Sequence, residues 1–264
     1  DCVIAAGVES MSRVPMGLPI SLPFKEGHGF YVSPNMQERY PNVQFSQFVG
    51  AEMVAKKYGL SKEDVDAYAY RSHERAIAAT QAGAFDTEIV PVEVPRGKKP
   101  PKVVDTDENP RRDISIEKLA KLKPAFQKGG SVTAGNASSL NDGAAALVLA
   151  SEEKVKALGL KPLAEIKAFS TKAVDPHYVG IASVPAIKDV LGQTGLGLGD
   201  VDLFEVNEAF ASYYLACEKE LGLDREKTNV NGSGISLGHP VGCTGARLIV
   251  TLYYELERQG LQLG

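Results

Sequence analysis

The second half of the chain alternates between stretches that predict buried strands and stretches that predict helices. From Thr133 onward, apolar runs such as GAAALVLA, LAEIKAFSTKAV and VDLFEV alternate with segments of helical periodicity, among them EEKVKALGL, VPAIKDVLGQTG, NEAFASYYLACEKELG and ARLIVTLYYELERQ. This alternation is typical of layered α/β domains with a parallel or mixed sheet. The opening run CVIAAGVE predicts one more buried strand. We therefore expect a layered α/β fold.

Residues 13–130 interrupt this pattern and predict an excursion from the layered scaffold. Between residues 12 and 42, five prolines punctuate a stretch of little periodicity, which predicts an extended or looping region. A helix is expected at 47–58, and a second one is expected to start after an N-cap at Ser61 and to end at Gly83. EIVPVEV predicts a strand, whereas the basic and proline-broken RGKKPPK, at 96–102, predicts an exposed loop.

Composition excludes several classes of protein. A formal net charge of −4 argues against broad attraction to nucleic acid or to an anionic membrane. The longest strongly apolar run, GAAALVLA, is far shorter than the roughly 20 residues of a membrane-spanning helix. Three widely separated cysteines make neither a disulfide framework nor a metal site. We therefore expect a protein of a reducing compartment, the cytoplasm, without a bound metal.

NGSGISLGHPVGCTGARL, at 231–248, gathers five glycines around one His-Pro pair. Gly232, Gly234 and Gly238 approach the dinucleotide-binding fingerprint, but their spacing is one residue too long, and no phosphate-binding lysine motif follows. What remains is a tight loop that presents His239. A histidine in such a loop either binds and transfers protons near neutral pH or serves as a structural cap, and spacing alone supports both readings equally.

Two other stretches, VNEAF and TAGNAS, combine small or polar residues with the ends of predicted elements. Asn207 falls where VDLFEV meets a helix, which predicts an N-cap with Glu208 in the first turn. Asparagine at such a strand end can also orient a water or a substrate oxygen. The helix that follows is expected to carry Tyr213 and Tyr214 along one apolar side. TAGNAS, at 133–138, suits either a thin ligand lying against the backbone or a simple tight turn.

Together these segments resemble one family. GVESMS, AEMVAKKYGLSKEDVDAYAYRSHERA, LAKLKPAF, TAGNASSLNDGAAALVLAS, VDLFEVNEAFAS and NVNGSGISLGHPVGCTGAR occur in the order seen in thiolases, which are acetyl-CoA acetyltransferases and 3-ketoacyl-CoA thiolases. The resemblance covers essentially the whole chain and implies a thiolase-like layered α/β/α/β/α fold with an inserted loop domain. It assigns 1–14 and 132–160 to an incomplete N-terminal half, 15–131 to the loop domain and 161–264 to a truncated C-terminal half.

The resemblance implies an acyl-CoA acyltransferase that cleaves 3-ketoacyl-CoA with free CoA or runs the reverse Claisen condensation. His239 and a water held by Asn207 would form an oxyanion hole, and His239 would also activate a nucleophilic cysteine. Five further positions match residues that contact CoA in the family: Ala134 and Ser138 on the pantetheine arm, Phe126 and Phe210 along its tunnel, and Arg111 near the adenine. CoA is then a substrate and no separate cofactor is expected. The full-length protein is expected to be a homodimer or homotetramer.

Two departures from the family pattern concern the acyl group. Ser46, Gln47 and Phe48 stand where short-chain biosynthetic members carry His-Met-Gly, and Val179 stands where they carry Met. These differences favour a broader range of 3-ketoacyl-CoA substrates over strict specificity for acetoacetyl-CoA.

A third departure concerns the cysteines. The two catalytic cysteines of the family stand in C-x-S-G and C-x-G-G motifs, and neither motif occurs in this chain. Cys2, Cys217 and Cys243 match neither position, and Cys243 is expected to be a small packing residue beside the glycine-rich loop. We therefore expect an internal fragment of a thiolase. The alternative is a non-catalytic, thiolase-like protein that binds CoA.

We predict that the purified 264-residue chain does not catalyse thiolysis of acetoacetyl-CoA, because both catalytic-cysteine motifs are missing. A spectrophotometric assay of acetoacetyl-CoA consumption in the presence of CoA checks this. Measurable thiolysis that is abolished by Cys243→Ala would contradict the prediction.

Overall fold

The computed structural model describes all 264 residues, and the first two long helices begin at capping serines. In α3 (Gln47–Tyr58), the Ser46 hydroxyl accepts a hydrogen bond from the backbone of the first turn, and the helix ends at a glycine with positive φ. In α4 (Lys62–Gln81), Ser61 and Asp64 form a reciprocal capping box. Both helices confirm the predictions for this part of the chain.

β1 (Cys2–Ser10) and β4 (Asp142–Ala150) confirm two predicted strands and form an antiparallel pair in continuous register. Residue 2 pairs with residue 150, and residue 10 with residue 142. The pair is therefore antiparallel, and not part of a parallel sheet within this chain. One face is exposed and apolar, with Ile4, Val8 and Val148 each more than 70% exposed.

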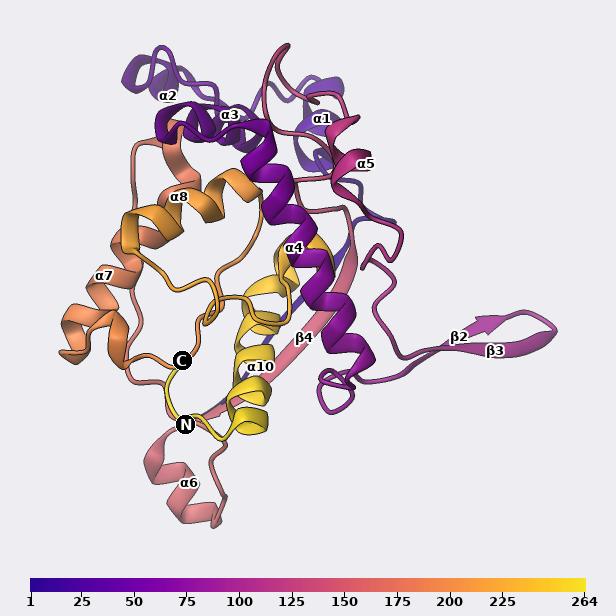
Figure 1. Cartoon of the computed structure of the whole chain (residues 1–264), viewed down its shortest axis with the longest axis vertical. Coiled ribbons are helices and arrows are strands. Elements are labelled where there is room, and N and C mark those ends of the chain that lie inside the picture. Colours follow the sequence, from indigo (N-terminus) through magenta and orange to yellow (C-terminus); the bar gives the residue numbers. More distant parts are fainter.

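The other face of the β1–β4 pair packs against α10 (Val241–Gln259), as Figure 1 shows. Two strand glycines permit a very close approach. A Cβ atom on Gly7 would lie 1.8 Å from the carbonyl oxygen of Gly242, and one on Gly143 would lie 2.6 Å from Cγ of Pro240. Since no larger residue fits at these points, the two glycines determine how closely α10 can pack on the sheet.

The excursion between the two strands is more regular than its sequence predicts. It contains, besides α3 and α4, the elements α1 (Leu18–Lys25), α2 (Pro34–Arg39), β2 (Val92–Arg96), β3 (Lys99–Val104) and α5 (Ile116–Ala120). The prediction of a looping region at 12–42 is wrong in part, because Pro19 and Pro34 stand in the first turns of α1 and α2, where the missing N–H costs nothing.

The expected loop at 96–102 is also wrong in part, because it forms the turn and part of β3 in a hairpin with β2. Proline is tolerated there, since a two-stranded hairpin consists only of edge strands. The hairpin projects away from the rest of the molecule in Figure 1, and nearly all its residues are exposed.

The C-terminal part is helical and irregular. Its elements are α6 (Glu152–Leu158), η1 (Pro176–Ile181), α7 (Ser183–Thr194), η2 (Leu198–Asp200), α8 (Ala211–Leu221), α9 (Gly234–Leu237) and α10. The strands predicted at 163–174 and 201–206 are not formed. A strand exists only with a hydrogen-bonded neighbour, and the sole pairing in these segments is an isolated bridge between Phe204 and Thr228.

The hydrophobic core is built around α8, which is buried along most of its length between α3 and α4. Tyr214 stacks on Tyr68 of α4, with ring centroids 4.2 Å apart. Tyr213 instead packs in a second cluster with Ala51 and Val54 of α3. The prediction that both tyrosines share one side is therefore wrong, because consecutive helical residues point about 100° apart.

No helix is both long enough and apolar enough to cross a membrane.

We predict that Gly7→Ala lowers the free energy of unfolding by about 1–3 kcal/mol, because the added methyl group must push α10 away from β1. Urea denaturation measures this. Gly192→Ala is the matched control, since position 192 lies in α7 with no atom near the added Cβ. This control should be neutral or stabilising, as alanine is the better helix former. Equal effects of the two substitutions would contradict the prediction.

Candidate functional site

His239 lies in the turn that connects α9 to α10. Gly238 has φ +96°, a conformation that favours glycine, and a Cβ there would lie 2.5 Å from the side chain of Asn141. The backbone N–H of His239 donates to Oδ1 of Asn141 at 3.2 Å. Asn141 directly precedes β4. The histidine is therefore attached to the sheet at one end and to α10 at the other.

Thr244 determines which ring nitrogen of His239 carries the proton. Its Oγ1 lies 2.7 Å from Nδ1 of His239 and 3.0 Å from the carbonyl oxygen of Pro240. A hydroxyl has one proton, and the carbonyl can only accept it, so Thr244 must accept from Nδ1–H. In the neutral ring, Nε2 is then unprotonated and free to accept a proton.

Asn207 faces this unprotonated nitrogen. Its Nδ2 lies 3.2 Å from Nε2 of His239, and its Oδ1 is buried without a hydrogen-bond partner. The predicted N-cap role is wrong, because α8 begins at Ala211 with Phe210 at the N-cap position. Glu208 likewise stands before the helix and not in its first turn. The structure thus brings together the two residues predicted as catalytic, Asn207 and His239.

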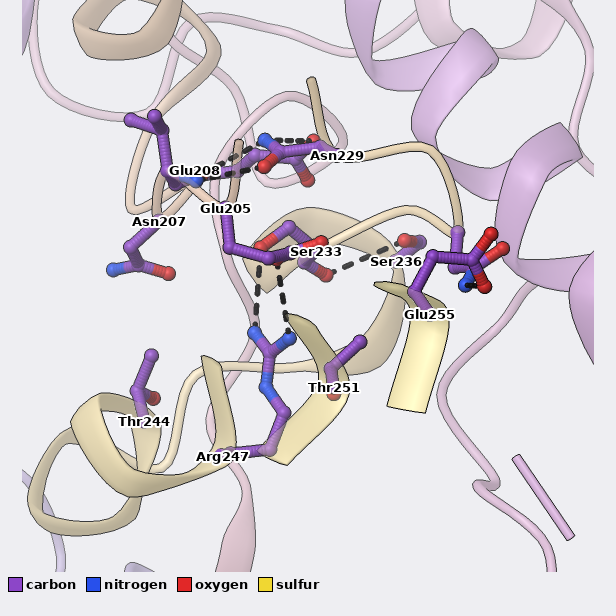
Figure 2. A network of polar contacts seen from close by, with 12 residues as sticks. Glu205, Asn207, Glu208, Asn229, Ser233, Ser236, Thr244, Arg247, Thr251 and Glu255 are labelled. Carbon is purple, nitrogen blue, oxygen red and sulfur yellow. Dashed lines mark hydrogen bonds and ion pairs between the residues drawn. The ribbon is translucent and has the colours of Figure 1, made fainter. Parts of the chain in front are cut away.

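The electrostatics keep the ring of His239 neutral. Burial lowers its pKa, and the positive charge of Arg247 lowers it further. Arg247 reaches from α10 to Ser233, at 3.3 Å, and to the carboxylate of Glu205, at 3.7 Å, as Figure 2 shows. Burial raises the pKa of Glu205 to about 8. A neutral histidine at pH 7 has the protonation state of a general base.

None of the three cysteines is placed to react at this histidine. Cys243 is buried in the first turn of α10 against β4, which confirms its predicted packing role, and burial raises the pKa of its thiol. Cys217 is buried in α8 beside Ser183, with its pKa also raised by burial. Cys2 lies exposed on β1.

A cavity of about 130 Å³ collects two of the five predicted CoA positions, Arg111 and Ala134. Arg111 and Lys118 are exposed residues that bring positive charge to its lining, although Lys118 also pairs with Asp113. His73 lines the interior and accepts a hydrogen bond at Nδ1 from the backbone N–H of Arg111; burial lowers its pKa to about 4. Lys118 and His73 were missed: Lys118 stands in no quoted motif, and nothing in the local pattern around His73 indicates a cavity.

The other three predicted CoA positions lie elsewhere. Phe126 stacks on Phe48 with centroids 4.3 Å apart, and Phe48 meets Phe210 edge to face at 5.9 Å. Ser138 donates its backbone N–H to the carbonyl oxygen of Ala209, next to Phe210. These residues form an aromatic cluster with one exposed end, Phe126, and Phe48 is the member that the sequence did not assign to it.

Comparison with known proteins identifies the family of the chain. The family models "Thiolase, N-terminal domain" and "Thiolase, C-terminal domain" match residues 1–153 and 160–264. The chain belongs to the thiolase family. It is 46% identical over 260 residues to a probable acetyl-CoA acyltransferase of Staphylococcus aureus strain COL, a match that covers 97% of this chain and 66% of the relative.

Solved thiolase structures show the same fold. The acetyl-CoA acetyltransferase of Bacillus anthracis is 47% identical with a TM-score of 0.84, and the match covers 99% of this chain and 66% of that one. Human mitochondrial 3-ketoacyl-CoA thiolase is 40% identical with a TM-score of 0.86, covering 98% and 66%. These likenesses confirm the predicted thiolase-like α/β fold. The chain spans about 66% of the length of the relatives it matches.

We predict that Thr244→Val shifts the ring of His239 away from the Nδ1–H tautomer. Valine keeps the shape but removes the acceptor, and one hydrogen bond of about 1 kcal/mol corresponds to several-fold in the tautomer ratio. The ¹⁵N chemical shifts of the imidazole report the tautomer. Thr244→Ser, which keeps the hydroxyl, should retain the original tautomer. An unchanged ratio in Thr244→Val would show that Thr244 does not set it.

Proposed function

We propose that the protein is an acyl-CoA acyltransferase that cleaves 3-ketoacyl-CoA with CoA or runs the reverse Claisen condensation. The observation that carries this proposal is the pairing of Asn207 with the unprotonated Nε2 of a neutral His239. Such a nitrogen can take the proton of a thiol and then donate it toward a thioester oxygen. The names of the relatives, acetyl-CoA acyltransferase and 3-ketoacyl-CoA thiolase, describe this chemistry.

Each residue of the pair has a separate task in this proposal. His239, once protonated, and the amide N–H of Asn207 are aimed donors for negative charge that develops on the substrate oxygen, directly or through a water. Burial of the ring, aided by the positive charge of Arg247, lowers the pKa of His239 and keeps the ring neutral in the resting state. The thiol that His239 activates is none of the three cysteines of this chain. Burial raises the pKa of Cys217 and Cys243, and Cys2 lies exposed at the start of β1, away from the Glu9 end that contacts α10.

CoA is the proposed substrate, and the cavity and the aromatic cluster would each contact a part of it. Arg111 and Lys118 supply positive charge for its phosphates, and Ala134 leaves room beside the backbone. Ser138, Phe126 and Phe210 then follow its pantetheine arm toward Asn207. A CoA complex of human mitochondrial 3-ketoacyl-CoA thiolase is among the similar structures, at 41% identity.

The acyl range, assembly and compartment are also proposals. Val179 is half exposed in η1, which supports a wide acyl pocket and hence a broader set of 3-ketoacyl-CoA substrates. The exposed apolar face of β1 and β4 supports further packing in a homodimer or homotetramer of the full-length protein. Three free cysteines suit a reducing cytoplasm.

The alternative is a thiolase-like protein that binds CoA without catalysis. It is favoured by one observation, the unsuitable position of all three cysteines. The two proposals share CoA binding and differ in turnover, so binding and thiolysis must be measured on the same preparation.

We predict that the complete gene product thiolyses 3-ketoacyl-CoA, and that His239→Ala lowers kcat by about 100-fold or more while CoA affinity changes little. Steady-state kinetics over several acyl chain lengths and calorimetric titration with CoA measure both. His28→Ala, in an exposed loop after α1, is the control and should leave kcat unchanged. CoA binding without turnover would support the alternative, and kcat/KM far highest for acetoacetyl-CoA would contradict the broad acyl range.

A further inference from the structure

Glu208 is a buried carboxylate with an unusually complete set of donors. Glu208 is 1% exposed. Oε1 accepts from the hydroxyl of Tyr68 at 2.6 Å and from Nδ2 of Asn229 at 3.2 Å. Oε2 accepts from the hydroxyl of Ser72 at 2.6 Å and from the backbone N–H of Ile235 at 3.1 Å. Each oxygen thus accepts two hydrogen bonds.

These donors come from separate parts of the chain. Tyr68 and Ser72 are one turn apart on α4, so they present both hydroxyls on the same face. Asn229, a non-glycine residue with φ +50°, belongs to the loop after α8. Ile235 lies in α9. One carboxylate therefore joins α4, the loop after α8 and α9. The first and last of these segments lie more than 150 residues apart in sequence.

Both partners of the proposed site depend on these same connections. Asn207 is the neighbour of Glu208 in the chain, and Val206 on its other side is bonded through both N–H and C=O to the side chain of Asn229. Figure 2 shows Asn229 bonded to Glu208 beside Asn207. α9, which receives Glu208 at Ile235, leads directly through Gly238 to His239.

The two segments also touch closely. A Cβ on Gly234 would lie 2.6 Å from Oδ1 of Asn207 and 3.1 Å from the carbonyl oxygen of Glu208. The distance between Asn207 and His239 therefore depends on the hydrogen bonds that Glu208 makes to the two segments that carry them. A displacement of about 1 Å in such a site can cost roughly 100-fold in rate.

We propose that Glu208 is a positioning residue for the acyl transfer, acting through Asn207 and His239, an inference that rests on the proposed function. Glu208→Gln keeps the shape but replaces one acceptor oxygen with an NH₂ group. The hydroxyl of Tyr68 or Ser72 can turn to accept from that NH₂ group, but the N–H of Asn229 or of Ile235 then faces a donor. α9 or the loop that carries Asn229 must therefore move, and the distance between Asn207 and His239 must change.

The test compares Glu208→Gln with Glu255→Gln in the complete gene product. Glu255 is another buried carboxylate, bonded to Asn231, Arg258 and Gln259 on the distal part of α10. We expect both variants to lose thermal stability. Glu208→Gln should lower kcat per folded molecule by about 10- to 100-fold with KM for CoA within about twofold. Glu255→Gln should leave kcat within about twofold.

A second readout does not require turnover. The imidazole ¹⁵N signals and titration midpoint of His239, assigned with His239→Ala, should change in Glu208→Gln and stay unchanged in Glu255→Gln. If the wild type shows no turnover but this difference appears, the acyltransferase proposal fails while the positioning role of Glu208 stands. Unchanged His239 signals, or a kcat unchanged after correction for folded protein, would overturn the inference.

Ser72→Ala keeps the test decisive if Glu208→Gln does not fold. It removes one donor to Glu208 and the hydrogen bond between the hydroxyls of Ser72 and Ser236, 2.8 Å apart, and leaves the carboxylate in place. We expect a several-fold lower kcat, a shifted His239 signal and an unchanged KM for CoA. A kcat and a His239 signal equal to those of the wild type would count against the inference.

Discussion

The contact between α10 and the β1–β4 pair is the constraint on which the rest of the site depends. Gly7 and Gly143 allow the first turn of α10 to approach the strand backbones to a distance that no side chain would permit. That first turn carries Cys243 and Thr244 and directly follows His239. Since Asn141 at the start of β4 holds the backbone of His239, the helix and the sheet together place the imidazole.

Hydrogen bonds then fix the orientation of the imidazole that this close packing places. Thr244 orients the imidazole of His239 through Nδ1. Asn207 faces Nε2 from a segment with no regular secondary structure. A segment without a sheet or helix ladder needs other bonds to hold it. Here the side chains of Asn229 and Glu208 supply them, so the part of the site with the least regular backbone has the densest side-chain bonding.

The sequence allowed prediction of features that depend on local chemistry. The capping serine at 61 and the glycine at 59 mark helix ends through local chemistry, and the structure confirms both. The strand predicted at 201–206 failed because a strand requires a partner that local pattern does not reveal. Asn207 and His239 were found through motifs, whereas the four donors around Glu208 come from distant segments and carry no shared local signal. The same holds for His73 and Lys118 at the cavity.

The pairing of β1 with β4 has a consequence for folding during synthesis. The two strands lie 132 residues apart at their nearest ends, and α10 follows almost a hundred residues later. At about 5–20 residues per second, roughly 7 to 26 seconds separate the synthesis of β1 from the start of its partner strand. During that interval β1 cannot make its contacts with β4 or α10, so this part of the fold forms only after segments that are made much later.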